Sequence, residues 1–245
     1  LLISQGAIER KTEYFLCGSA YQEAPTAANS IAKELTQILV NRGYGIKFFK
    51  IHSQAFVQDY SGLSLTDRGT VLSKIKLDVD PALRCQLLAK KVIFIDDIQI
   101  TGLHKRHVQA FFSSLGIEQA IFGYIAVLND RDGKSHPLIE WALNHSEINN
   151  LQKLSILASK DDFQPNARIC KFILASSSKE IEDFIDVLPL ETLTLLLAMM
   201  RADGYHTQPE YQVNFHTLSK IVNEKRVKIL DKTKRSSEKY LSIGV

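Results

Sequence analysis

Cysteine is scarce in this 245-residue chain, and its three copies lie far apart. Cys17, Cys85 and Cys170 are odd in number and form neither a CxxC pair nor a cluster with histidine. The sequence therefore predicts neither a disulfide framework nor a zinc site. Separated free cysteines are typical of a reducing compartment, so we expect a cytoplasmic protein.

The sequence also lacks a long apolar run. Residues 193–200 form only a short apolar block, which is typical of a core helix and too short to span a bilayer. No secretory signal peptide is apparent. Hydrophobic residues make up 45% of the chain and charged residues 23%, as in ordinary globular proteins. We expect no membrane partner.

Charge of one sign dominates only near the end of the chain. Residues 216–245 contain eight Lys or Arg and three Asp or Glu, so they carry +5 and the remainder carries −2. A basic segment can bind nucleic acid or acidic membranes. Here acids are interleaved and aromatic residues are almost absent, which favours a solvated helix over a nucleic-acid interface.

The most informative stretch is KVIFIDDIQITGLH, residues 91–104. Four apolar residues run directly into Asp96 and Asp97, which is typical of a strand buried on both faces that ends in acids. Open α/β sheets bind ligands at that end of a strand. Thr101 and Gly102 then lead into a helix whose first N–H groups form an anion site. This combination predicts a ligand with both hydroxyl and phosphate groups.

Two other interpretations of the acidic pair fail on sequence grounds. A Walker-B strand needs a GxxxxGK[ST] loop, and the only Gly-Lys-Ser, at 133–135, lies downstream with Leu128 at the first glycine position. A phospho-acceptor pair of receiver type would follow the first strand, whereas at least two strands precede Asp96. No Ser-His-Asp or Cys-His pattern indicates a nucleophile.

The rest of the chain predicts an α/β fold with a parallel, Rossmann-like sheet and a helical C-terminal region. We expect an α/β domain over residues 1–148 and helices over residues 149–245. The first domain is expected to contain strands at 14–17, 45–51, 92–95 and 119–128, and helices at 27–40, 81–88, 103–115 and 136–144. Residues 129–133 are expected to form a loop. The second region is expected to contain helices from an S-x-x-E capping box at 177–180, from Pro189 and over 216–230. Residues 52–80 are either a lid over a site or an excursion with a short helix.

The segment VIFIDDIQITGLH resembles the phosphoribosyl pyrophosphate (PRPP) signature of type I phosphoribosyltransferases. The resemblance implies transfer of a phosphoribosyl group from PRPP to a nitrogen acceptor, with release of pyrophosphate and with Mg²⁺ as cofactor. It implies that Asp96 and Asp97 bind the ribose hydroxyls as the catalytic pair and contact the metal indirectly through Mg-PRPP. The acceptor is expected to be a base or a base-like small molecule, and a homodimer is the expected assembly.

The resemblance also assigns the phosphate contacts. The 5′-phosphate loop comprises Ile98, Gln99, Ile100, Thr101, Gly102, Leu103 and His104. The pyrophosphate contacts comprise Ser19, Ala20, Tyr21, Lys50 and Arg68. Residues 52–80 correspond by position to the hood that excludes water from the ribosyl centre in this family.

The chain departs from the family signature at three positions. Gln99 and Ile100 stand where apolar and then small residues are usual, and His104 replaces the closing Ser or Thr. These sequence motifs are also similar, more loosely, to those of phosphoribosyltransferase-like proteins from bacterial stress and tellurite-resistance gene clusters. These departures leave a second hypothesis open, in which the protein binds PRPP or a nucleotide without turnover and regulates a partner.

Overall fold

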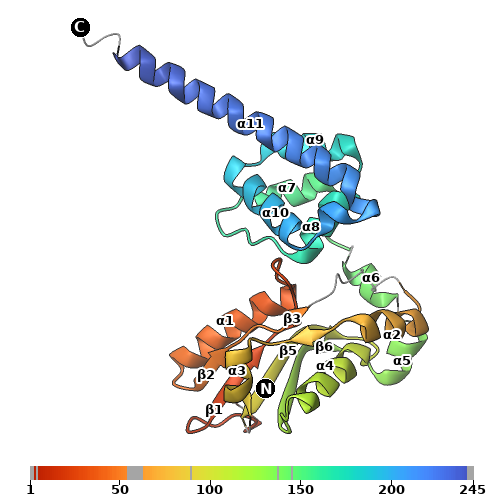
Figure 1. Ribbon diagram of the computed structural model, residues 1–245. Coiled ribbons are helices and arrows are strands. Elements are labelled where there is room, and N and C mark those ends of the chain that lie inside the picture. Colours follow the sequence, from red (N-terminus) through yellow and green to blue (C-terminus); the bar gives the residue numbers. More distant parts are fainter. Residues whose placement is uncertain are drawn as a thin grey trace. The chain divides into compact units, whose positions relative to one another are not determined.

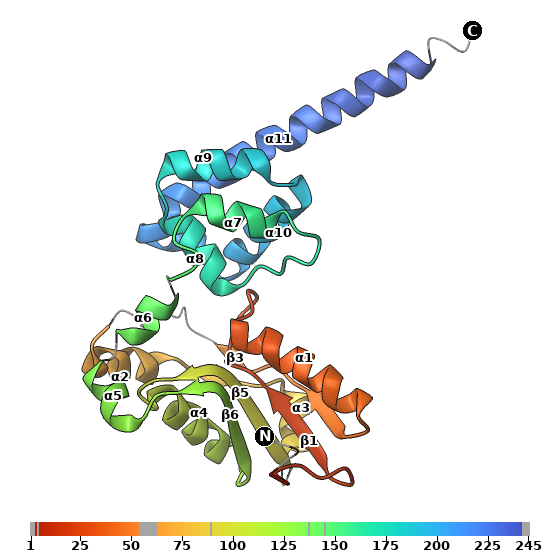
Figure 2. The same cartoon turned by 180° about the vertical axis from the view of Figure 1, so that it is seen from behind.

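The computed structural model describes residues 3, 5–53, 63–88, 90–136, 138–144 and 146–241. The chain divides into two compact units, Leu1–Glu147 and Ile148–Val245. Figures 1 and 2 show an α/β unit followed by an all-helical unit.

A four-stranded parallel sheet forms the centre of the first unit. Its strands are β1 (Glu13–Cys17), β2 (Gly45–Phe48), β5 (Lys91–Gln99) and β6 (Ala120–Val127), in the spatial order β2-β1-β5-β6. A separate antiparallel pair joins β3 (His52–Ser53) to β4 (Leu77–Asp78). The predicted parallel α/β fold is confirmed, because every pairing in the main sheet is parallel.

Helices cover the two faces of this sheet. The helices of the unit are α1 (Ala27–Asn41), α2 (Leu65–Lys74), α3 (Pro81–Leu87), α4 (Leu103–Ser114), α5 (Asp130–Ser135) and α6 (Ile139–Asn144). One core cluster joins α1 to one sheet face through residues such as Leu39 and Ile93. The other joins α3 and α4 to the opposite face through residues such as Leu87, Phe94 and Phe112. The alternation of side chains along each strand supplies apolar groups to both layers.

Several predicted boundaries in this unit were wrong. The helix expected from residue 136 begins at Ile139 as α6, because His136 ends α5 instead. Strand β2 ends at Phe48 rather than at residue 51, because the chain beyond it leaves the sheet and His52 pairs with Tyr21 and β4. Strand β5 continues to Gln99, past both acids. The expected loop at 129–133 is mostly helix α5, whose first turn is capped by the Asn129 side chain accepting from the Asp132 N–H at 2.9 Å.

The second unit consists of α7 (Leu151–Ala158), α8 (Ala167–Ala175), α9 (Ser178–Val187), α10 (Leu190–Ala202), the 3₁₀ turn η1 (Tyr205–Thr207) and α11 (Pro209–Leu241). The capping box is present, since Ser177 and Glu180 exchange side-chain and backbone hydrogen bonds at the start of α9. Helices α7 and α8 were not expected, and α11 is longer than the predicted helix at both ends.

Helix α11 holds the ends of two neighbouring helices. The Asn214 amide donates to the carbonyl oxygens of Leu174 and Ser176, both at 2.8 Å, at the end of α8. The Lys225 ammonium donates to the carbonyls of Ile185 and Leu188, both at 2.9 Å, at the end of α9. Carbonyls at helix ends lack partners within their helix, so these two side chains supply donors to the ends of α8 and α9.

Replacing Asn214 with alanine should destabilise the helical unit by about 1–2 kcal/mol, because two carbonyls lose their donor. Amide hydrogen exchange in α8 measures the change. The matched control is Gln212→Ala, an exposed position on the same helix, for which we expect a change within about 0.5 kcal/mol. Equal exchange rates in the two variants would show that Asn214 does not cap α8.

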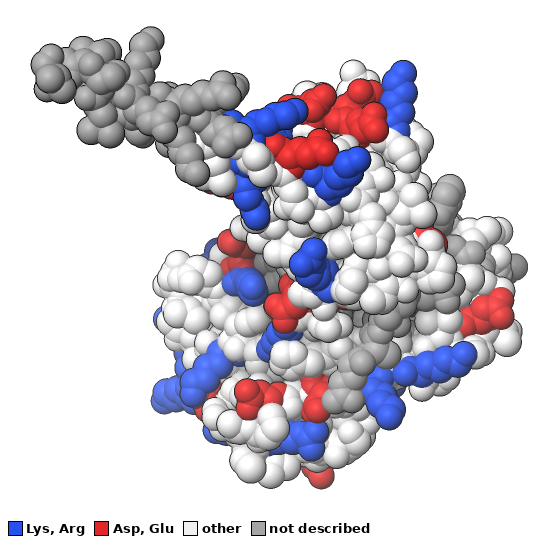
Figure 3. All heavy atoms as spheres, turned by 45° about the horizontal axis from the view of Figure 1, so that its top comes forward, with Lys and Arg blue, Asp and Glu red and all other residues white. Residues whose placement is uncertain are grey.

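On the face shown in Figure 3, acidic and basic side chains of the described residues are interspersed. Within the described ranges, no helix combines the length and apolar character needed to cross a membrane.

Candidate functional site

The candidate site lies between β1 and β5, where the order in which strands are added to the sheet reverses. From β1 the chain first builds outward to β2, then returns to place β5 on the other side of β1. This is the topological switch point, where open α/β sheets form a ligand crevice at the carboxyl ends of their strands. Ser19, just after β1, and Asp96, in β5, meet across it, with the serine hydroxyl donating to Asp96 Oδ1 at 3.0 Å.

Asp96 is also bonded to the start of α4. His104 Nδ1 lies 2.9 Å from Asp96 Oδ2, and its ring makes an edge contact with Phe94 at 5.7 Å between centroids. The N–H of Asp97 donates to Asp96 Oδ1 at 3.2 Å. Both oxygens of Asp96, a residue only 8% exposed, are therefore held by the protein. The structure thus brings Ser19, Asp96 and His104 together, although they were predicted to bind different parts of a ligand.

Asp96 and Asp97 both lie within β5, and their side chains start from opposite faces of the sheet. Its ladder with β6 extends past them to the pairs Ile98–Ala126 and Gln99–Val127. Successive side chains of a strand alternate between faces, so Asp96 and Asp97 start from opposite faces of the sheet. Asp97 is half-exposed, and its Oδ1 accepts from the N–H of Ile98 at 2.8 Å.

The predicted phosphate loop is shorter than expected. Its first two members remain in β5, so only Ile100, Thr101 and Gly102 form the turn before α4. Thr101 is buried, and its hydroxyl accepts from the Leu103 N–H at 3.4 Å. Gly102 has φ +69°, a left-handed conformation that favours glycine. Its neighbours Leu103 and His104 open α4, whose free N–H groups and dipole favour an anion.

A glycine from α5 supports this turn. A Cβ atom built on Gly133 would overlap the carbonyl oxygen of Ile100 and lie 2.8 Å from its carbonyl carbon. Helix α5 therefore approaches the turn closely only because position 133 lacks a side chain. Sequence reasoning considered Gly133 only as a failed P-loop residue and missed this contact.

The residues predicted to contact pyrophosphate occupy four places. Tyr21 and Lys50 lie together, with the ammonium 4.4 Å from the tyrosine ring centroid, in hydrogen-bond contact with the carbonyl of Gln22 and 3.7 Å from Glu23. Ala20 packs against the core beneath α4. Ser19 belongs to the Asp96 group described above.

Arg68 lies elsewhere. It is 2% exposed in α2, and its Nε donates to the Leu63 carbonyl at 3.0 Å. The described part of the expected lid, residues 52–53 and 63–80, forms β3, α2 and β4, and α2 packs near α4. Burial and the nearby His104 lower the pKa of His107 on that helix. Residues 54–62 of the expected lid lie outside the described residues.

Tyr124 is a polar residue beside Asp96 that sequence reasoning missed. It is the β6 partner of Asp96 in the sheet register, and its hydroxyl oxygen is buried without a hydrogen-bond partner among the described residues. The available signal was the alternation of β6, which places Tyr124 on the same sheet face as Phe122.

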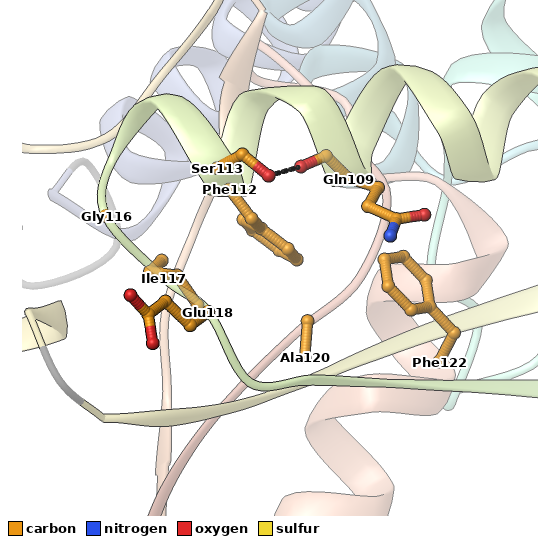
Figure 4. A pocket seen from close by; sticks show the side chains of 8 residues that line it. All are labelled: Gln109, Phe112, Ser113, Gly116, Ile117, Glu118, Ala120 and Phe122. Atoms are coloured by element: carbon orange, nitrogen blue, oxygen red, sulfur yellow. Dashed lines mark hydrogen bonds between the residues drawn. The ribbon is translucent and has the colours of Figure 1, made fainter.

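A separate cavity of about 230 Å³ lies between α4 and the first half of β6. Figure 4 shows Phe112 and Phe122 facing one another across it, with Gln109 and Glu118 near its edges. None of the predicted site residues lines this cavity. In the described part of the chain, no three His, Cys, Asp or Glu side chains are grouped to hold a metal ion.

Comparison with known families identifies one whose model matches most of the chain. The PRTase ComF-like family matches residues 13–218. The chain belongs to this family. The expected phosphoribosyltransferase relationship is thereby confirmed, and the match runs beyond the α/β unit into α11. The unassigned helical region is thus largely within this PRTase ComF-like match.

Several solved structures resemble the chain distantly. The hypoxanthine-guanine phosphoribosyltransferase of L. donovani shares 12% identity over 49% of this chain and 56% of that one, with a TM-score of 0.33. A hypoxanthine-guanine phosphoribosyltransferase from Bacillus anthracis shares 17% identity over 53% of this chain and 65% of that one, with a TM-score of 0.36. The Trypanosoma cruzi hypoxanthine phosphoribosyltransferase shares 10% identity over 51% of this chain and 65% of that one, with a TM-score of 0.35. The chain covers less than two thirds of each enzyme. No protein of curated function matches this PRTase ComF-like chain.

Proposed function

We propose that this protein binds PRPP and transfers its phosphoribosyl group to a base or base-like nitrogen acceptor, releasing pyrophosphate. The observation that supports this most is the contact of Ser19 with Asp96 across the switch point. It lies beside a turn that ends in left-handed Gly102 and opens α4. An acidic group for sugar hydroxyls and a helix N-terminus for phosphate are thus adjacent in the chain and in space.

The reaction exchanges one bond at the anomeric carbon for another. The bond from C1′ to the pyrophosphate oxygen breaks, a bond from C1′ to the acceptor nitrogen forms, and the acceptor's proton passes to solvent. Asp96 and Asp97 would fix the ribose through its hydroxyls, and the turn from Ile100 to Gly102 would hold the 5′-phosphate. Lys50 is close enough to the β1–α1 loop to oppose charge growing on pyrophosphate. Catalysis of this kind relies on positioning and charge stabilisation, so no nucleophilic side chain is required.

We also propose Mg²⁺ as the cofactor, neutralising pyrophosphate charge when bound. The residues fit an ion that arrives with its ligand, because Asp96 and Asp97 offer oxygen donors but the described residues form no cage of three acids. Mg²⁺ commonly binds through one or two carboxylates together with phosphate oxygens and waters.

The second candidate function is PRPP or nucleotide binding without turnover, in a regulatory protein. One observation favours it: His104 bonds to Asp96, so the carboxylate expected to bind ribose already has a partner on each oxygen. Binding would have to share or replace these contacts.

Titration calorimetry with PRPP and Mg²⁺ tests both candidates, and a pyrophosphate-release screen over free bases separates them. The transferase hypothesis expects binding and release of pyrophosphate with at least one base. Binding without release for any base supports the regulatory hypothesis. Absence of PRPP binding contradicts both, and so does equal binding by the double variant Asp96→Asn/Asp97→Asn.

A further inference from the structure

Two neighbouring strands present matching pairs of side chains toward α4. On β5 these are Phe94 and Asp96, and on β6 their register partners are Phe122 and Tyr124. The rings of Phe94 and Phe122 pack at 5.5 Å between centroids. Because side chains alternate along each strand, Asp96 and Tyr124 stand one step further toward the carboxyl ends, on that same face. The Tyr124 side chain therefore starts beside Asp96, on the sheet face that α4 covers.

The Tyr124 hydroxyl has an unusual environment. Its oxygen is shielded from solvent, yet no described residue forms a hydrogen bond with it. Burial raises the pKa of the Tyr124 phenol, and the negative charge of Asp96 raises it further, so the group keeps its proton. Native proteins leave few buried polar atoms without a partner, because each one loses its hydration without compensation. A hydroxyl of this kind beside a ligand crevice indicates a partner supplied by the ligand.

The neighbouring carboxylate specifies the kind of partner. Asp96 accepts from Ser19 and the Asp97 N–H on Oδ1, and it is bonded to His104 through Oδ2. A carboxylate oxygen can accept two hydrogen bonds, so Oδ2 can receive one more donor. A sugar hydroxyl that donates there still has lone pairs of its own, which need a donor. The protonated phenol of Tyr124 is suited to that role.

We propose that Tyr124 is a substrate-binding residue whose hydroxyl donates to a ribose hydroxyl of the ligand held by Asp96. This inference rests on the proposed PRPP-binding function and extends its site to β6. The sugar hydroxyl donates a hydrogen bond to Asp96, and its oxygen accepts a hydrogen bond from Tyr124. The pair thus selects a ligand that carries a hydroxyl at this position over its deoxy counterpart.

The variant Tyr124→Phe tests the proposal because it removes only the oxygen and keeps the ring. PRPP affinity, measured by calorimetry with Mg²⁺, should fall about five- to tenfold, as expected for one lost hydrogen bond. The urea midpoint of the protein without ligand should stay equal or rise, because the oxygen removed had no partner. The matched control Tyr44→Phe removes a phenol oxygen next to β2 in the same unit, and it should leave affinity unchanged.

Three outcomes separate this inference from the proposed function. If the wild-type protein does not bind PRPP, the proposed function fails and the inference fails with it. If the wild type binds and Tyr124→Phe binds equally well, only the inference is overturned. If Tyr124→Phe lowers the urea midpoint together with the affinity, the hydroxyl has a structural role and the inference is likewise overturned.

Discussion

Replacing Gly133 with alanine should destabilise the α/β unit by about 2–3 kcal/mol and weaken PRPP binding by about tenfold or more. The new methyl group would occupy the space of the Ile100 carbonyl oxygen. Neither atom can move freely, because Gly133 lies within α5 and Ile100 is the first residue of the turn between β5 and α4. The turn must therefore shift or α5 must move away. Because the turn opens the proposed phosphate site, stability and affinity should fall together. Chemical denaturation and calorimetry measure the two effects.

Gly69 provides the matched control. It lies within helix α2, and a Cβ atom there would meet nothing within 4 Å. Gly69→Ala should therefore stabilise the protein by about 0.5–1 kcal/mol, since alanine is the better helix former. Equal stability of Gly133→Ala and the wild type would show that α5 does not support the turn.

Elements with strong local signals were predictable from the sequence. Helix α1 begins after Thr26 as expected, and Ser177 and Glu180 mark the start of α9. The helices that were missed, α7 and α8, also have local signals. Asn150 accepts from the Lys153 N–H at 2.8 Å, and Asn166 accepts from the Ile169 N–H at 3.0 Å. Asparagine is a favoured N-cap residue but is also common in turns, so the residue type alone does not distinguish the two.

The end of β5 could not be predicted from local sequence. Charged residues usually end a buried strand, yet β5 continues because Ile98 and Gln99 pair with residues of β6. Strand pairing of this kind depends on a neighbour almost thirty residues away in sequence, at Ala126 and Val127. Local propensity does not report on such partners.

The sequence predicted several residues of the candidate site but not the hydrogen bonds between them. Ser19 and Asp96 were both identified as ligand-binding residues, but they are separated by 77 positions. Their hydrogen bond depends on β1 and β5 being neighbours, which only the sheet order establishes. The contact of His104 with Asp96 depends in the same way on how α4 packs on the sheet.

Asp96 and Asp97 should differ sharply when each is replaced by asparagine. Asp96→Asn should weaken PRPP binding about 10- to 100-fold, the effect of losing a charged acceptor. It should also destabilise the protein by about 1–3 kcal/mol, because the amide keeps only one acceptor oxygen and places an NH2 group against either Ser19 or His104, both of which contact Asp96. Calorimetry and chemical denaturation on the same preparations measure both quantities.

Asp97→Asn is the matched control because it makes the same chemical change one residue along the strand. Asp97 is half-exposed whereas Asp96 is 8% exposed, so we expect a stability loss below about 1 kcal/mol for Asp97→Asn. Its PRPP affinity should still fall if both acids bind the ribose. Equal stability losses in the two variants would contradict the assignment of Asp96 as the buried centre of the switch point. A loss of affinity confined to Asp96→Asn would place the ribose on the α4 face of the sheet, where Ser19, His104 and Tyr124 surround a single carboxylate.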